Sequence, residues 1–218
     1  MNSMMNDIKH HLTDALLIAY SAGSLPEGFN LVVATHISMC DECRARMHEF
    51  DAVGGAVMEA EPPMGLSDGS FAATLAKIAN TPKVETAAPT AKSDLPAPLQ
   101  DYVGGDLADV KWCKVGGGVR QAILKTDKSA SVRLLHIPAG AQMPDHGHRG
   151  MELTLVLQGA FKDETDRFGA GDIEVASEDD HHQPVAEEGQ DCICLAATDA
   201  PLRFNGWIPR IAQPFLRI

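Results

Sequence analysis

The segment that most constrains this chain is a short run with one histidine and two cysteines. His36, Cys40 and Cys43 stand at positions i, i+4 and i+7 of this run. If the run is helical, or is helical and then turns tightly, the three side chains share one face and can bind a single tetrahedral ion. The spacing therefore predicts a structural zinc site, which needs a fourth ligand from elsewhere in the chain.

Two adjacent histidines upstream, His10 and His11, are candidates for the fourth ligand. The helical phase puts His11 nearer than His10 to the apolar face that follows, but an N-cap at Thr13 would leave both outside the helix, so either can serve. The alternative to a metal site is a redox-active or buried thiol pair, with His36 as an ordinary core histidine. The extra histidines favour the metal, because a redox CxxC pair does not need them.

The first eighty residues have helical spacing. Helices are expected at 13–22, at 41–58 and at 67–79. A further helix is expected to begin at a capping box formed by Ser24 and Glu27 and to run to His36. Such short helices bury little apolar area, so a bound ion would add stability that the small core lacks. Residues 1–80 are therefore predicted to form a small zinc-binding helical bundle.

The rest of the chain lacks this helical spacing. Residues 81–97 contain three prolines and no periodicity, which predicts a linker. After it, short β-prone runs alternate with turn residues, and 98–218 is predicted to be a β sandwich or barrel. Its last stretch, 201–218, fits either a closing strand or an extended tail. The expected fold class is a two-domain α+β chain. The β-prone runs are 118–126, 131–138, 151–158, 172–176 and 191–197.

Charge and cysteine content restrict the partners and the compartment. A formal net charge of −12 argues against direct binding of nucleic acid, which requires a clustered basic surface, and suits a basic protein partner. The start of the chain has no basic segment before an apolar one, and no apolar run reaches the length of a membrane span. Five unevenly spaced cysteines fit a reducing compartment. We therefore expect a cytoplasmic protein that does not bind a membrane.

A second candidate metal site lies in the β-prone part. His146 and His148 are two residues apart, so on an extended segment their side chains point to the same side. Glu152 begins the next predicted strand. Together with a further histidine from a facing strand, these side chains could hold a divalent metal inside a small barrel.

This second constellation resembles the first motif of the cupin superfamily. Its pattern, Gly-x5-His-x-His-x3-Glu-x6-Gly, is met at every position. The second cupin motif is poorly kept, with Gly171-Asp172 at its turn. The resemblance implies a cupin β-barrel or jelly roll that binds zinc or another divalent metal, with His182 as the remaining ligand. His181 stays open as the alternative, because a one-residue slip in register reverses the face. The matching residues are Gly140, His146, His148, Glu152 and Gly159.

The N-terminal pattern resembles the zinc-binding anti-sigma domain, in which an upstream histidine joins His-x3-Cys-x2-Cys. This resemblance implies that His11 completes the site with His36, Cys40 and Cys43. A zinc anti-sigma domain followed by a cupin domain is the architecture of ChrR-type anti-sigma factors. The similarity runs along nearly the whole chain, including His-His-x-x-Asp-Ala-Leu-Leu near the start, Leu-Val-Val-Ala-Thr-His before the cysteines and Glu-Leu-Thr-Leu-Val-Leu-Gln-Gly-Ala-Phe in the cupin.

The resemblance implies a regulator rather than an enzyme. Such a protein binds an extracytoplasmic-function (ECF) sigma factor in a 1:1 complex in the cytoplasm and blocks its assembly with RNA polymerase. The cupin domain would receive the inducing signal, singlet oxygen or a related oxidant. The rival hypothesis is a cupin metalloenzyme, a dioxygenase or isomerase, with an accessory zinc domain. Against it, no catalytic group beyond the metal ligands is identifiable.

Three further cysteines have no assigned role. Cys192 and Cys194 alternate along a predicted strand and therefore face the same side. We expect them to be small buried apolar residues, with redox-sensitive thiols as the alternative, and we expect the same of Cys113.

Overall fold

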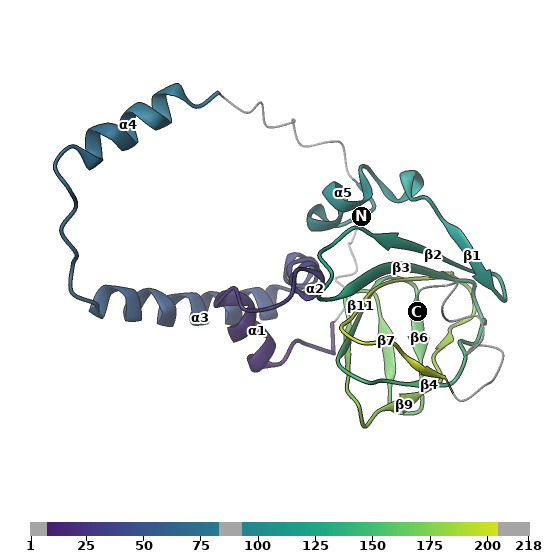
Figure 1. Cartoon of the computed structure of the whole chain (residues 1–218). Helices are drawn as coiled ribbons and strands as arrows, with labels where there is room; N and C mark the ends of the chain where they lie inside the picture. The colour runs from purple at the N-terminus through teal and green to yellow at the C-terminus, as the bar shows by residue number, and fades with distance from the viewer. Residues whose placement is uncertain (1–7, 83–92, 205–218) are drawn as a thin grey trace, which may run out of the picture.

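The computed structural model describes residues 8–82 and 93–204, in which helices come first and strands follow. Figure 1 shows the helices extending from one side of a body of strands. We refer to α1–α4 as the helical region and to the strands as the β region. The helices are α1 (Asp14–Ser21), α2 (Glu27–Met39), α3 (Asp41–Ala60), α4 (Ser70–Asn80), α5 (Ala97–Val103) and the short 3-10 helix η1 (Leu107–Asp109).

The described strands form three antiparallel sheets. The largest has the order β1-β2-β3-β11-β5-β8, and the two small ones have the orders β10-β6-β7 and β12-β4-β9. The three sheets do not join into one closed hydrogen-bonded barrel within the described residues. The strands are β1 (Cys113–Gly116), β2 (Val119–Leu124), β3 (Ser131–Ile137), β4 (His146–Gly147), β5 (Glu152–Gln158), β6 (Ala160–Lys162), β7 (Arg167–Gly169), β8 (Ile173–Ala176), β9 (His181–His182), β10 (Val185–Ala186), β11 (Cys192–Thr198) and β12 (Arg203–Phe204).

The helix boundaries follow from local chemistry. The Thr13 hydroxyl caps α1 by accepting a hydrogen bond from the Leu16 amide at 3.3 Å. The expected capping box at Ser24 is wrong: its hydroxyl donates to the Ala19 carbonyl at 3.1 Å, and Pro26 takes the N-cap of α2. The α2 helix ends before Cys40, whose backbone is extended and whose sulfur accepts the Cys43 amide at 3.4 Å. The second cysteine ligand candidate therefore lies in the first turn of α3.

One hydrophobic core joins the helical region to the outer face of the large sheet. Buried side chains of α2, among them Val32 and Val33, belong to the same cluster as Leu134, Leu155 and Leu195 of the central strands. Alternate residues of those strands face a second cluster inside the β region, which includes Val156, Phe161, Cys192 and Cys194. Both faces of the central strands are buried, and their sequences are therefore nearly continuous apolar runs.

The predicted linker is partly structured. Its middle, 83–92, lies outside the described residues. Leu95 is buried, and Ala97 begins α5, which packs against α2. The sequence pattern missed this helix because it is only two turns long.

The outer part of the helical region stands apart from the core. Cys43 and Met47, near its start, are the buried residues of α3, and α4 has none. Figure 1 shows α3 running away from the β region and α4 lying beyond it. No helix in the described ranges is both long and apolar enough to cross a membrane. The final stretch 205–218 lies outside the described residues, and β12 precedes it.

Two helical glycines allow a test of the shared core. A methyl group added at Gly28 of α2 would lie 2.6 Å from Val132 Cγ2 and 3.0 Å from Ala130 Cβ, whereas one at Gly54 of α3 would meet nothing within 4 Å. We expect Gly28→Ala to lower the free energy of unfolding by about 1–3 kcal/mol through overpacking. Gly54→Ala should raise it by up to about 1 kcal/mol, because alanine is the better helix former. Urea unfolding measures both; equal stabilisation of both variants would contradict the packing of α2 on β3.

Candidate metal centres

The first centre brings together the four residues predicted from the sequence. One donor atom from each of His11, His36, Cys40 and Cys43 lies within 4.8 Å of the other three. His11 approaches from the segment before α1, His36 lies in the last turn of α2, and the cysteines flank the start of α3. The α2–α3 junction therefore holds three of the donors, and the N-terminal segment supplies the fourth.

The distances fit a tetrahedral ion. Nδ1 of His11 lies 3.3 Å from the Cys40 sulfur and 3.6 Å from the Cys43 sulfur. Around zinc, with the usual bond lengths to nitrogen and sulfur, such donors stand about 3.5 Å apart. The other ring nitrogen of His11, Nε2, lies 3.4 Å from a carboxylate oxygen of Glu42, an arrangement that orients ligating histidines.

His36 is the clearest sign that this group serves an ion. Its side chain is fully buried, and among the described residues neither ring nitrogen has a partner with good hydrogen-bond geometry, although the Gly171 backbone lies close enough to act on its pKa. An orphaned buried imidazole is costly unless a bound ion accepts its lone pair. Burial, with a contribution from His11, lowers the pKa of His36 to about 4, which favours the neutral ligating form.

The thiols need an ion to become ligands. Burial raises the pKa of Cys43 to about 11, so the surroundings alone favour the protonated thiol. Zinc ligation reverses this preference by stabilising the thiolate. Two cysteines and two histidines form one of the usual donor sets of structural zinc.

His10 does not belong to this group. Its ring packs against Phe168 with centroids 4.3 Å apart, and its Nε2 lies 3.2 Å from the Arg167 carbonyl oxygen. Adjacent residues of an extended segment point to opposite sides, so His10 faces the β region while His11 faces the cysteines. The structure therefore favours His11 over His10 as the fourth donor.

The second centre lies inside the β region and contains three imidazoles. Nε2 of His182 lies 3.1 Å from Nε2 of His146 and 3.3 Å from Nε2 of His148, and all three side chains are buried. Nitrogen ligands of a tetrahedral zinc stand about 3.3 Å apart, so the three atoms could share one ion. Nδ1 of His148 has no hydrogen-bond partner within the described residues.

Strand pairing explains why His182 and not His181 faces this group. The β4–β9 pair sets His146 opposite His182 and Gly147 opposite His181. Successive residues of a strand point to opposite faces, so His181 is exposed while His182 is buried.

Glu152 lies beside the three imidazoles but is not one of the clustered donors. One of its oxygens is 3.9 Å from Nδ1 of His148, and the other accepts a hydrogen bond from the Thr154 hydroxyl at 3.1 Å. Burial lowers the pKa values of His146 and His148, and the Glu152 charge opposes the shift.

Two acidic residues that the sequence analysis missed support His182 from behind. Nδ1 of His182 lies 2.8 Å from a Glu174 oxygen and 3.4 Å from an Asp163 oxygen. Burial lowers the pKa of His182, but the bond to Glu174 and the nearby carboxylates outweigh it and raise the value to about 9. Such a carboxylate–histidine pair orients a metal ligand. The alternation of β8 could have revealed Glu174, since it is an acidic residue among apolar neighbours.

A cavity of about 300 Å³ opens beside the three imidazoles. His146, His182 and Glu152 line one side, and apolar side chains such as Leu135 and Phe161 line much of the rest. This volume admits a small apolar molecule next to the histidine group.

The remaining cysteines differ in their exposure. Cys192 and Cys194 are buried with their sulfurs 3.5 Å apart, and Cys194 also lines the cavity. The hydrogen bond between the Cys194 and Cys192 thiols, together with burial, raises the pKa of Cys194 well above its usual value. Both are therefore buried, as expected. The expectation for Cys113 is wrong: it lies exposed on the edge strand β1.

Comparison with known proteins covers both regions. The family model described as the ChrR Cupin-like domain matches residues 100–201. The anti-sigma-E factor ChrR of Cereibacter sphaeroides is 62% identical over 213 residues, which is 97% of this chain and 99% of that protein. A crystal structure of Rhodobacter sphaeroides SigE in complex with the anti-sigma ChrR matches with a TM-score of 0.78 and 61% identity, and covers 88% of this chain and 99% of that chain. A cupin-like α+β fold is thus confirmed, and the chain belongs to the ChrR family of anti-sigma factors.

Proposed function

We propose that this protein binds and inhibits an ECF sigma factor in a 1:1 complex in the cytoplasm and releases it after an oxidative signal such as singlet oxygen. The observation that carries the proposal is an uncovered apolar face on α3 and α4. Support comes from the full-length similarity to ChrR, which was solved in complex with SigE. This family membership ranks the regulator above a cupin metalloenzyme.

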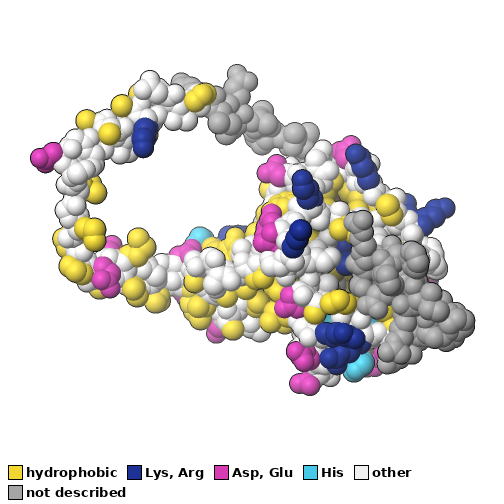
Figure 2. Space-filling model, viewed as in Figure 1, with side chains coloured by type: hydrophobic (Ala, Val, Ile, Leu, Met, Phe, Trp, Pro, Cys, Tyr) yellow, Lys and Arg dark blue, Asp and Glu magenta, His cyan; other side chains and the backbone are white. Residues whose placement is uncertain are grey.

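The apolar face consists of large exposed apolar side chains of α3, of α4 and of the segment between them. Met58 of α3 is 78% exposed and Phe71 of α4 is 75% exposed. Figure 2 shows hydrophobic side chains gathered along the outer end of α3 and along α4. Soluble monomers rarely leave an extended apolar surface in water, so such a surface marks a partner site. We define the apolar face as Val53, Val57, Met58, Met64, Leu66, Phe71, Leu75 and Ile78.

An ECF sigma factor suits this face in two ways. Phe71, Leu75 and Ile78 stand at helical spacing, so we expect them to act as anchors that fill an apolar groove of the sigma factor. The sigma factor must also present a basic surface to promoter DNA, which the acidic excess of this chain complements. Occupation of that surface would exclude RNA polymerase and DNA together.

A pair of exposed apolar residues tests the face. Phe71→Glu should weaken the complex with the sigma factor by at least about 30-fold, since a charge would replace a central aromatic anchor and such anchors contribute about 2 kcal/mol or more. The residue is not buried, so thermal unfolding should not change. The matched control is Ile123→Glu, at an exposed apolar position of β2. Equal affinity of both variants, measured by calorimetry, would rule out α4 as a contact.

We further propose that His11, His36, Cys40 and Cys43 bind one zinc ion. The ion would fasten the N-terminal segment to the α2–α3 junction, in addition to the buried apolar contacts of Leu12 and Ile37 there. Its binding energy is folding energy for the helical region, because the unfolded chain does not hold His11 and the other three donors in a preformed site. The sequence analysis expected a helical bundle over residues 1–80. In this proposal the bundle consists of α1, α2 and the zinc-stabilised start of α3.

Zinc content of two cysteine variants tests this site. Cys43→Ser should lose one equivalent of zinc and loosen α1 and the start of α3, because serine is a poor zinc ligand at a buried position. Cys113→Ser, at an exposed cysteine, should keep the wild-type zinc content. Elemental analysis of the purified chains gives the result. Unchanged zinc in Cys43→Ser would refute the assignment.

We propose that the β region, 98–218, receives the signal at a divalent metal, zinc or another, held by His146, His148, His182 and Glu152. When bound, the ion would supply a Lewis-acidic centre facing the cavity. Glu174 would keep His182 oriented toward it. The residues nearest the helical region belong to the outer sheet face, so a change in the β region can reach α2 directly. The division into a binding part, 1–80, a linker, 81–97, and a sensing part remains part of this proposal.

Two histidine variants separate signal reception from inhibition. In cells, His146→Ala should keep basal repression of a sigma-dependent promoter and blunt its induction by light with a photosensitiser, because the second centre would lose a ligand while the apolar face stays intact. His181→Ala replaces the exposed neighbour of His182 and should respond as the wild type does. Normal induction in His146→Ala, with loss of the metal verified, would place signal reception elsewhere.

A further inference from the structure

The turn between β7 and β8 holds the chain segment that carries His11. One oxygen of the Asp172 carboxylate, Oδ1, accepts the backbone amides of Lys9 at 2.6 Å and of His10 at 3.0 Å. The other, Oδ2, accepts the amide of Gly169 at 2.8 Å. A side chain of the β region thus binds the main chain of the helical region directly before a candidate zinc ligand.

Neighbouring contacts lay the same segment onto the turn. The Ile173 amide donates to the His10 carbonyl at 3.3 Å, and the His10 ring packs on Phe168. Gly171 has a φ of +94°, and a Cβ there would come within 2.7 Å of the Ile8 side chain. The turn therefore needs glycine both for its left-handed backbone and for the space that Ile8 fills.

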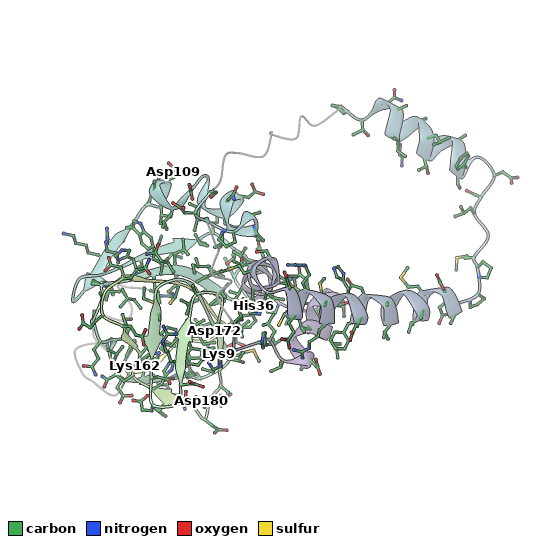
Figure 3. All side chains as sticks on the ribbon, turned by 180° about the vertical axis from the view of Figure 1, so that it is seen from behind. Lys9, His36, Asp109, Lys162, Asp172 and Asp180 are labelled. Carbon is green, nitrogen blue, oxygen red and sulfur yellow. The ribbon has the colours of Figure 1, made fainter. Side chains whose placement is uncertain are left out.

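The imidazole of His11 depends on this arrangement, and that of His36 lies beside it. His11 follows directly after the held residues and precedes α1, so the position of its ring is set by the backbone of Lys9 and His10. His36 lies close enough to Gly171 and Asp172 for both to act on its pKa. Figure 3 labels Lys9, His36 and Asp172, which lie together where the helices meet the strands.

The burial of Asp172 requires an explanation that the second centre does not provide. Asp172 is only 4% exposed. A buried carboxylate is costly unless several donors satisfy it, and backbone amides that bind an ionised acceptor form strong hydrogen bonds. Glu174 and Asp163, not Asp172, contact the histidines of the second centre. The Asp172 carboxylate accepts hydrogen bonds from three backbone amides, and two of these amides belong to the N-terminal segment.

We propose that Asp172 is a positioning residue of the zinc site in the helical region: by holding the backbone of Lys9 and His10, it places His11 against Cys40 and Cys43. The inference rests on the proposed zinc site. It means that the β region supplies part of the support of that site. The zinc affinity of the helical region then depends on the integrity of the β7–β8 turn.

Cobalt substitution isolates the site in the full chain. Thiolate-to-cobalt absorption reports only a site that contains cysteine, so the three-histidine centre does not contribute. We expect Asp172→Ala to release this cobalt to a chelator about tenfold faster than the wild type, the lower end of the usual effect of removing a supporting group of a metal ligand. Asp172→Asn keeps one oxygen acceptor and should fall between Asp172→Ala and the wild type. It also serves as the variant to measure if alanine prevents folding.

Asp106→Asn is the matched control. Its carboxylate also accepts several backbone amides, those of Asp94, Leu95 and Leu107, but away from either centre. It should leave the release rate unchanged even if it lowers the melting temperature. Wild-type release in both Asp172 variants, or equal acceleration by Asp106→Asn, would overturn the inference while leaving the zinc site standing. Absence of thiolate bands from the wild type would overturn the zinc site and the inference with it.

Discussion

The packing of α2 on the outer face of the large sheet is the contact on which the other features depend. It buries Val32 and Val33 with Leu134 and Leu195, and it needs a glycine at position 28 to approach β3. It also brings His36, at the end of the helix, to the β7–β8 turn. This contact supports the first centre from the α2 side, as Asp172 supports it from the side of the N-terminal segment, and it fixes the end of α2 from which α3 continues.

The two centres are joined through a short stretch of β structure. Asp172 holds the segment before His11, and Glu174, two residues later, holds His182. Glu174 belongs to β8, and this strand begins at the turn that contacts the N-terminal segment. Hydrogen bonds of this stretch therefore form a short route from the proposed sensing site to the segment that carries His11.

The sequence predicted those parts that depend on local spacing. Zinc-like spacing at His36, Cys40 and Cys43, and the cupin pattern around His146, lead to donors that do lie together. Helix and strand positions followed from apolar periodicity, which reports burial on one side of an element. The strands with two or three residues, such as β4 and β9, are too short to leave a pattern.

Features that depend on long-range contacts could not be predicted. The role of Asp172 arises from its approach to Lys9 and His10 across most of the chain. His11 rather than His10 faces the cysteines, because the His10 side of the N-terminal segment packs against the β region. Periodicity could place Phe71, Leu75 and Ile78 on one helix face, but it could not show that α4 leaves that face uncovered.

Transcription with purified components tests the central claim most directly. RNA polymerase, an ECF sigma factor that co-purifies with this protein and a promoter template are combined with increasing amounts of the full chain, and transcripts are counted. The account predicts that transcription stops when the chain reaches one equivalent of sigma factor, while transcription with the housekeeping sigma factor continues. Undiminished ECF-dependent transcription at a large excess of the folded, zinc-containing chain would contradict it.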